Sequence, residues 1–241
     1  MPKLCDMKNI EEYMEHYRLA APDNPFLLED NKEYIEHYRL AVQDNPFYLE
    51  DMEEDLQTEE ICKCAVQKYG HALEYVRNNL QTEEVCKCAV QDDGLALQFV
   101  MVRNQTEDIC KCAVQQNGLA LQYVCWGLKT EEICKLAIQE NPRALEYLNY
   151  DAYDEDIYDL QEMYKLAIKT HCWYFKYLPE KLQTEEICKI AVKERGYLLK
   201  YVKNQTEEIC KLAVQEWEGA LEYVKDEYKT EEIIELALKS K

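Results

Sequence analysis

A threonine that recurs every 24 residues is the feature that most constrains this chain. Each copy begins nearly the same text: Thr-Glu-Glu-Ile-Cys-Lys-x-Ala-Val-Gln, then x-x-Gly-x-Ala-Leu-x-Tyr-Val. The series is Thr58, Thr82, Thr106 and Thr130, and it resumes at Thr184, Thr206 and Thr230. A fixed period between roughly 20 and 50 residues is typical of repeat arrays. The chain is therefore expected to stack copies of one unit rather than to surround one central core.

Within a copy, positions are counted from the threonine as zero. Threonine is a good helix N-cap, and the two glutamates after it are favoured by the helix dipole. Apolar residues follow at +3, +4, +6, +7 and +8, and they predict a first helix with a wide buried arc. Glu at +1 and Lys at +5 are spaced for ion pairs on the solvent face. The expected pairs are Glu59–Lys63, Glu83–Lys87, Glu107–Lys111, Glu131–Lys135, Glu185–Lys189 and Glu207–Lys211.

A second short helix is expected after the Gly or Pro at +12, where the text reads small-Leu-x-aromatic-Val from +14 to +18. Helices of about ten and eight residues are too short to be stable alone, so stacking must supply their burial. The predicted fold is an all-α α-solenoid of about nine two-helix repeats with a C-terminal capping helix, Glu231–Lys239.

The same pattern organises the whole chain as a single repeat domain, residues 1–241. Two divergent acidic repeats occupy 1–57, with position zero at Tyr13 and Tyr34, and regular repeats fill 58–148. An acidic insertion, 149–159, precedes a degenerate repeat over 160–182 with its zero at Leu160. Regular repeats and the cap complete 183–241.

The formal net charge of −20 disfavours direct binding to nucleic acid, whose phosphates require clustered Lys and Arg. The negative charge gathers in residues 1–57, with 15 acidic and 5 basic side chains, and in the insertion, with five acidic ones. No apolar run approaches the roughly 18 residues of a membrane span. The first residues, Met1–Asp6, lack the apolar region of a secretory signal, so an intracellular, non-secreted protein is expected.

Cysteine is the strongest candidate for chemistry, because twelve are present and several follow a Cys-Lys-Cys pattern, as at Cys62 and Cys64. Side chains two residues apart on a helix point about 200° apart, so one such pair cannot chelate one ion. Position +6 also exchanges Cys88 for Leu136 or Ile190 in other copies. Core packing is therefore favoured over a metal or redox role. His16, His37, His71 and His171 form no catalytic set, and no enzyme, metal or cofactor is expected.

Aromatic residues offer two further candidates. The +17 column holds Tyr75, Phe99, Tyr123, Tyr147, Tyr177, Tyr201 and Tyr223, and Phe99 fits it without a hydroxyl, which favours packing over recognition. Trp126, Trp173 and Trp217 share no column. Partial burial between units is one interpretation of these tryptophans, and exposed binding anchors are the other.

The insertion is the one place where the chain leaves its pattern. Its acidic residues are Asp151, Asp154, Glu155, Asp156 and Asp159. Insertions in repeat arrays usually become loops on one face. A solvated loop and a docking loop for a basic partner both remain open, whereas the ligand spacing of an EF-hand is missing.

The pattern Thr-x-Glu-Ile-x-x-x-Ala-Val…Ala-Leu-x-Tyr-Val resembles a short repeat family of unknown function, common in large DNA viruses of amoebae and in some protists. Residues 58–148 and 184–239 carry the resemblance well, 160–181 weakly, and 9–52 only in outline. The resemblance implies a viral or protist origin and an intracellular setting, and it implies no enzymatic activity.

Taken together, these features predict a non-catalytic scaffold that binds another protein through equivalent positions of successive repeats. An acidic decoy or chaperone for basic proteins, such as histone-like or nucleic-acid-binding ones, is the alternative, because the charge is so negative. A structural component of a virus particle is a third hypothesis. The oligomeric state does not follow from the sequence.

Overall fold

The structure is a computed structural model, and it describes residues 32–50, 52, 56–148 and 159–239. These residues form α-helices and short 3-10 helices joined by turns, and they contain no strand. The chain divides into two compact units, residues 1–128 and 129–241. The single-domain organisation over residues 1–241 stays a prediction.

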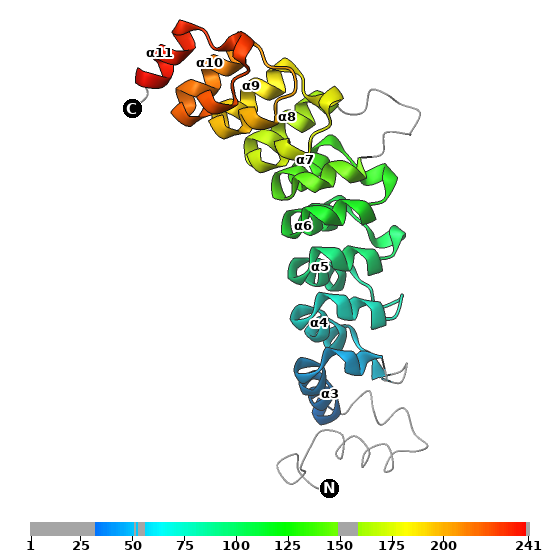
Figure 1. Ribbon diagram of the computed structural model, residues 1–241. Helices are drawn as coiled ribbons and strands as arrows, with labels where there is room; N and C mark the ends of the chain where they lie inside the picture. Colours follow the sequence, from blue (N-terminus) through cyan, green and yellow to red (C-terminus); the bar gives the residue numbers. More distant parts are fainter. Residues whose placement is uncertain (1–31, 51, 53–55, 149–158, 240–241) are drawn as a thin grey trace. The chain divides into compact units, whose positions relative to one another are not determined.

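In the first unit, α-helices alternate with 3-10 helices (Figure 1). The α-helices pack on one another in chain order, as do the 3-10 helices η2, η4, η5 and η7, so the unit has one layer of each kind. The α-helices are α3 (Lys32–Asp44), α4 (Glu59–Lys68), α5 (Glu83–Asp92) and α6 (Glu107–Gln116). The 3-10 helices are η2 (Pro46–Leu49), η4 (Gly70–Tyr75), η5 (Gly94–Phe99), η6 (Val102–Asn104), η7 (Gly118–Tyr123) and η8 (Trp126–Leu128).

The second unit repeats this arrangement and ends in α11 (Glu231–Lys239), as predicted for the cap. Its other α-helices are α7 (Glu131–Glu140), α8 (Leu160–Thr170), α9 (Glu185–Glu194) and α10 (Glu207–Glu216). Its 3-10 helices are η9 (Pro142–Tyr147), η10 (Cys172–Tyr177), η11 (Glu180–Leu182), η12 (Gly196–Tyr201), η13 (Glu218–Tyr223) and η14 (Asp226–Tyr228). Each unit is therefore an all-α solenoid of stacked repeats, which confirms the predicted fold class. The divergent repeat at Tyr13 lies outside the described residues.

The threonines begin the α-helices as predicted. The hydroxyl oxygen of Thr58 accepts a hydrogen bond from the backbone N–H of Ile61 at 3.3 Å, and the other repeat threonines make the equivalent bond at 3.3–3.4 Å. Because this bond satisfies an otherwise free N–H of the first turn, it fixes where each helix starts.

The second helix of each repeat is tighter and shorter than expected. It is a six-residue 3-10 helix rather than a helix of about eight residues. The apolar positions explain this, because +14 and +17, and likewise +15 and +18, are three residues apart, and a 3-10 helix turns once every three residues.

The sequence also holds a cap for this helix that the repeat pattern did not reveal. The side chains of Asp93 and Asn117 at +11 accept bonds from Leu95 and Leu119 N–H at 2.9 and 3.0 Å.

A buried or half-buried glutamine one position before the threonine joins the two layers in most repeats. The amide of Gln105 donates to the carbonyl oxygen of Tyr123 at 3.0 Å, and its oxygen accepts from the N–H of Cys125 at 2.9 Å. Gln57, Gln81 and Gln205 make the same pair of bonds. In the repeat that starts at Thr130, Lys129 replaces glutamine and donates to the carbonyl of Tyr147 at 3.1 Å, and burial lowers the pKa of this lysine.

Glycine at +12 lets successive repeats approach closely. A Cβ on Gly94 would lie 2.3 Å from the carbonyl oxygen of Ala113 in the next repeat, and Gly70 and Gly196 lie in the same relation to the following copy. The N–H of Gly94 donates to the side-chain oxygen of Gln116 at 2.6 Å. No non-glycine or glycine residue of the described chain has a positive φ. The glycine is therefore required by the close approach and not by the backbone angle.

Candidate interaction surfaces

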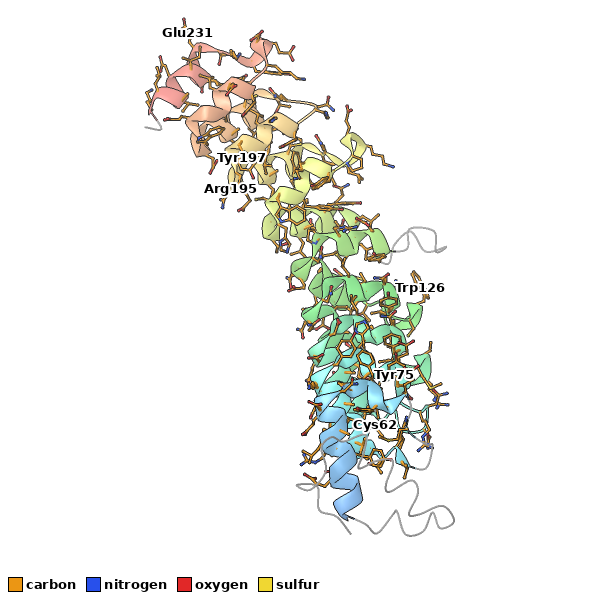
Figure 2. All side chains as sticks on the ribbon, turned by 60° about the horizontal axis from the view of Figure 1, so that its bottom comes forward. Cys62, Tyr75, Trp126, Arg195, Tyr197 and Glu231 are labelled. Atoms are coloured by element: carbon orange, nitrogen blue, oxygen red, sulfur yellow. The ribbon has the colours of Figure 1, made fainter. Side chains whose placement is uncertain are left out.

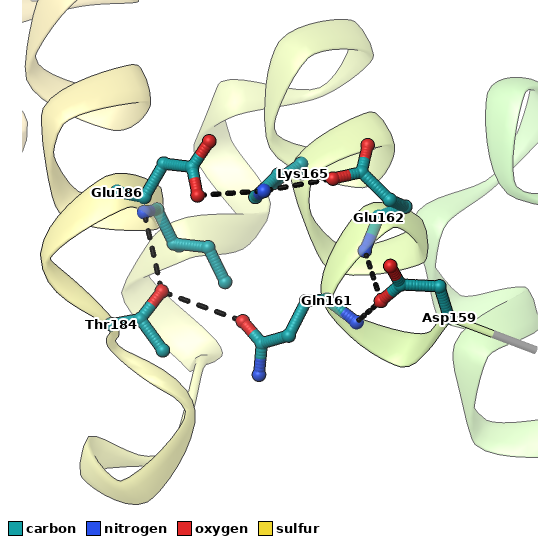
Figure 3. Close-up of polar contacts among 7 residues, drawn as sticks. Asp159, Gln161, Glu162, Lys165, Thr184 and Glu186 are labelled. Atoms are coloured by element: carbon teal, nitrogen blue, oxygen red, sulfur yellow. Dashed lines mark hydrogen bonds and ion pairs between the residues drawn. The ribbon is translucent and has the colours of Figure 1, made fainter.

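The exposed positions +1, +2, +5 and +9 of the α-helices form what we call the helix side. Here lysines at +5 link consecutive helices in several repeats. Lys165 contacts Glu162 at 2.8 Å in its own helix and Glu186 at 2.7 Å in the next one (Figure 3). Lys189 and Lys211 repeat this bridge to Glu208 and Glu232. The helix side is thus a ladder of ion pairs in which acidic residues outnumber lysines.

The predicted pairs within one helix form in four of six cases: Glu107–Lys111, Glu131–Lys135, Glu185–Lys189 and Glu207–Lys211. Lys63 instead pairs with Glu84 of the following helix. The links between repeats were not expected from the sequence, since the partners are 19 to 21 residues apart. Exposed pairs of this kind contribute about 0.2–1 kcal/mol each, so the ladder matters more for the character of the surface than for stability.

The cysteines separate into two environments. Position +4 is fully buried, and burial raises the pKa of Cys86 to about 11 and that of Cys110 to about 12. Position +6, by contrast, is half-buried, and the amide of Gln67 donates to Cys88 Sγ at 3.7 Å. The Cys/Leu/Ile exchange at +6 had predicted core packing. The structure places this column at the edge of the core, where the side chains are half-buried. No group of three or more metal-binding side chains gathers in the part of the chain that the structure describes.

The aromatic +17 column is half-buried in most repeats, which agrees with packing. Its carbonyl groups accept the buried glutamine bonds described above. Tyr177 departs from this column, because 62% of its surface is exposed. The three tryptophans are also exposed: Trp126 to 44% at the start of η8, Trp173 to 43% in η10, and Trp217 to 42% at the end of α10. Each tryptophan is thus partly covered and partly exposed, which agrees with partial burial between units and also leaves a surface for an exposed binding anchor.

A larger regularity joins these residues. Among the described residues, every exposed large aromatic lies in a 3-10 helix or at the residue that caps the preceding α-helix. We call this surface, built from positions +11, +13, +16 and +17 together with η8, the 3-10 side. Its exposed aromatics are Phe47, Tyr69, Trp126, Trp173, Tyr177, Tyr197 and Trp217.

In the first unit, rings on the 3-10 side pack on one another across repeats. Phe47 lies 5.3 Å from Tyr69 between ring centroids, and His71 lies 5.4 Å from Phe99. Nδ1 of His71 also approaches Oδ2 of Asp93 in the next repeat to 3.0 Å, without the alignment of a hydrogen bond. Sequence spacing did not reveal this partner, because it comes from another copy, 22 residues away.

In the second unit, the 3-10 side adds positive charge to the rings. Trp173 packs edge-on against Tyr174 and Tyr177, with centroids 6.0 and 6.2 Å apart. The ammonium of Lys176 lies 4.5 Å from the centre of the Tyr177 ring, and that of Lys200 lies 5.8 Å from the centre of Tyr201. Lysines supported by tyrosine rings thus occur in two successive repeats, η10 and η12.

The acidic insertion is mostly not described. Asp151, Asp154, Glu155 and Asp156 lie outside the described residues, as does most of the acidic region 1–57. Asp159 is described, and it is the N-cap of α8. Its Oδ1 accepts from the N–H groups of Gln161 at 3.0 Å and Glu162 at 3.2 Å (Figure 3). The degenerate repeat therefore begins at Asp159, one residue before the expected zero at Leu160.

Two of the four histidines have no described side chain. His16 and the side chain of His37 lie outside the described part of the chain. Nε2 of His171 lies 2.7 Å from the carbonyl oxygen of Gln139, so this ring links two repeats. No helix in the described part of the chain is both long enough and apolar enough to cross a membrane.

The family model described as Domain of unknown function (DUF4116) matches residues 38–81, 58–105, 106–151 and 161–205. The chain belongs to the DUF4116 family. These matches cover the regular repeats up to residue 205 and the degenerate repeat, which confirms a repeat family of unknown function. No curated protein and no solved structure matches the chain. The DUF4116 repeat is thus seen here as an α-helix and a 3-10 helix joined by a buried glutamine.

Proposed function

We propose that this DUF4116 protein is a non-catalytic scaffold that binds another protein through the 3-10 side of its repeats. The observation that carries the proposal is the location of the exposed aromatics, all of which lie on that side among the described residues. Tyrosine and tryptophan supply much of the energy of protein–protein interfaces, because they bury large areas at a small entropic cost. The helix side, where glutamate and lysine form ion pairs, presents no exposed aromatic residue in the part of the chain that the structure describes.

The proposal assigns no cofactor and no catalytic residue. It includes an intracellular setting, since the buried thiols occupy positions that other repeats fill with apolar residues and suit a reducing compartment. Trp126, Trp173 and Trp217 are the proposed anchors. Asp151, Asp154, Glu155, Asp156 and Asp159 are the proposed contacts of the alternative, in which the chain acts as a decoy for basic proteins. That alternative draws its support from the net charge of −20.

Affinity capture with a matched pair of variants tests the proposal. One variant carries Tyr69→Ser, Trp173→Ser and Trp217→Ser on the 3-10 side. The control carries Gln91→Ala, Gln115→Ala and Gln215→Ala, three exposed positions of the helix side. Partners captured by the parent should be lost from the first variant and kept by the control. Equal capture by both variants would remove the 3-10 side from consideration.

The salt dependence of capture separates the alternatives. An interface anchored by aromatic rings should survive high salt, whereas a decoy held by exposed charges should release its partners as screening increases. Replacing the insertion's four aspartates by asparagine and its glutamate by glutamine should weaken only the second kind of binding. A structural role in a virus particle would instead show as abundance of the chain in purified particles.

A further inference from the structure

The second unit contains a stretch whose charge opposes that of the chain. Residues 169–203 hold eight basic and four acidic side chains, although the chain as a whole has a net charge of −20. Two of those acids, Glu185 and Glu186, contact Lys189 and Lys165 on the helix side. The remaining positive excess therefore includes residues of the 3-10 side, where Lys176, Arg195 and Lys200 are found.

These cations share one surface with exposed rings. Lys176 rests over the Tyr177 ring, and Trp173 borders the same ring edge-on. Tyr197 is exposed one turn before Lys200, and Figure 2 places it beside Arg195 on the same side of the unit. We call Trp173, Lys176, Tyr177, Arg195, Tyr197 and Lys200 the cationic-aromatic surface.

The two repeats that contribute to this surface are adjacent. Helices η10 and η12 pack against each other. The contact with Tyr177 contributes most to raising the pKa of Lys176, and Tyr201 and Tyr197 of η12 raise it further. The ammonium of Lys176 is therefore near rings of both repeats and stays charged at neutral pH. The surface is therefore continuous across a repeat boundary, and among the described residues no carboxylate contacts Lys176 or Lys200.

We propose that the cationic-aromatic surface binds an extended acidic peptide segment of a partner protein. This inference rests on the proposed scaffold function and names the chemistry of one partner. Carboxylates of such a segment would meet the ammonium groups of Lys176 and Lys200 and the guanidinium of Arg195, forming charge-assisted bonds. Apolar side chains between the carboxylates would cover Trp173 and Tyr197. An acidic segment would also be directed to this surface, because the helix side carries two acidic residues for each lysine at +5 in the regular repeats and repels anions.

Single-stranded nucleic acid is the competing anionic ligand, and the ring geometry argues against it. Proteins that bind single-stranded nucleic acid stack its bases on free aromatic faces. Here one face of Tyr177 is covered by Lys176, and Trp173 meets its tyrosine neighbours at 83° and 84°, edge to face. A polyphosphate backbone would additionally approach the many glutamates of a chain with net charge −20. A short acidic peptide carries less charge and needs no stacking.

Fluorescence polarisation with a labelled Glu-Leu-Asp-Tyr repeat peptide tests the inference on the full chain. The parent should bind this peptide, and binding should weaken at high salt. The variant Lys176→Gln with Lys200→Gln should bind roughly tenfold more weakly, the loss expected when two charge-assisted contacts are removed. The matched control, Lys169→Gln with Lys193→Gln, removes the same charge from the same two repeats at +9 of the helix side and should bind like the parent.

The outcomes separate this inference from the function on which it rests. Equal binding by both double variants, or no binding of the peptide by the parent, overturns the acidic-peptide inference. Tighter binding of labelled oligodeoxythymidylate than of the peptide overturns it in favour of nucleic acid. In each of these cases the scaffold proposal still stands if the aromatic variant loses its captured partners. All substituted side chains are exposed, so circular dichroism should show unchanged helix content.

Discussion

The helix side and the 3-10 side of these repeats use their exposed positions differently. On the helix side, glutamates at +1 and +2 and lysine at +5 recur in almost every copy and pair with each other. On the 3-10 side, positions +13 and +16 change from Leu95 and Gln98 in η5 to Trp173 and Lys176 in η10. The difference indicates that the helix side serves the stacking of repeats, while the 3-10 side gives each repeat its own recognition chemistry.

The contrast depends on how firmly the 3-10 layer is attached to the α-helical layer, and Gln105 tests this attachment most strongly. Gln105→Leu should lower the free energy of unfolding by roughly 2–4 kcal/mol, because Tyr123 C=O and Cys125 N–H lose their buried partner and each unsatisfied group costs about 1–3 kcal/mol. Chemical denaturation followed by circular dichroism measures the change. Gln122→Leu, on the exposed surface of the same repeat, should change it by less than about 0.5 kcal/mol.

The next largest effect should come from the contact between successive repeats. Gly94→Ala places a Cβ against the carbonyl oxygen of Ala113, so the free energy of unfolding should fall by about 1–3 kcal/mol, the usual cost of overpacking. Gly127→Ala is the matched control, since no atom lies within 4 Å of the added Cβ. Equal stability of the two variants in thermal unfolding would mean that repeats can separate freely, and that the glycine column has another origin.

The cysteines sharpen the boundary between core and helix side. Cys86→Ser should destabilise by roughly 1–2 kcal/mol, because it buries a hydroxyl in an apolar site, whereas Cys88→Ser should cost less than about 0.5 kcal/mol at its half-buried position.

Alkylation offers a second measurement on the same two residues. At mildly alkaline pH, iodoacetamide should modify Cys88 before Cys86, whose pKa burial raises to about 11 and whose thiolate is correspondingly scarce. Mass spectrometry of the native protein identifies the sites. Faster modification of Cys86 would contradict the assignment of +4 to the inner core.

The smallest effect concerns the ion-pair ladder. Lys189→Met removes contacts to Glu185 at 2.9 Å and Glu208 at 2.6 Å, yet it should destabilise by less than about 1 kcal/mol, because these side chains are exposed and screened. The difference from the parent should shrink further at high salt. A large, salt-resistant loss would show that the ladder holds the repeats together, which would weaken the distinction between the two sides.

The sequence by itself determined the period, the threonine caps and the first helix of each repeat, because these depend on spacing and on contacts within a few residues. Thr58, for example, marks the start of a helix in the sequence and caps that helix in the structure. The glutamine column was also visible, since Gln57, Gln81, Gln105, Gln183 and Gln205 all precede a threonine, but the partners of Gln105, for example, lie 18 and 20 residues away. Local patterns carry no signal for such bonds.

Only the tertiary structure decided which exposed residues lie together. The 3-10 geometry of the second helix fixes where +13, +16 and +17 project, and stacking then brings Lys176 of one repeat near Tyr197 and Tyr201 of the next. In the same way, stacking pairs Lys165 with Glu186 and brings Asp93 to His71. Such neighbours are about one repeat apart in sequence. The repeat pattern therefore predicted that copies stack. Which side chains meet depends on how closely the copies approach, and the glycine at +12 sets that distance by packing against the alanine carbonyl of the next repeat.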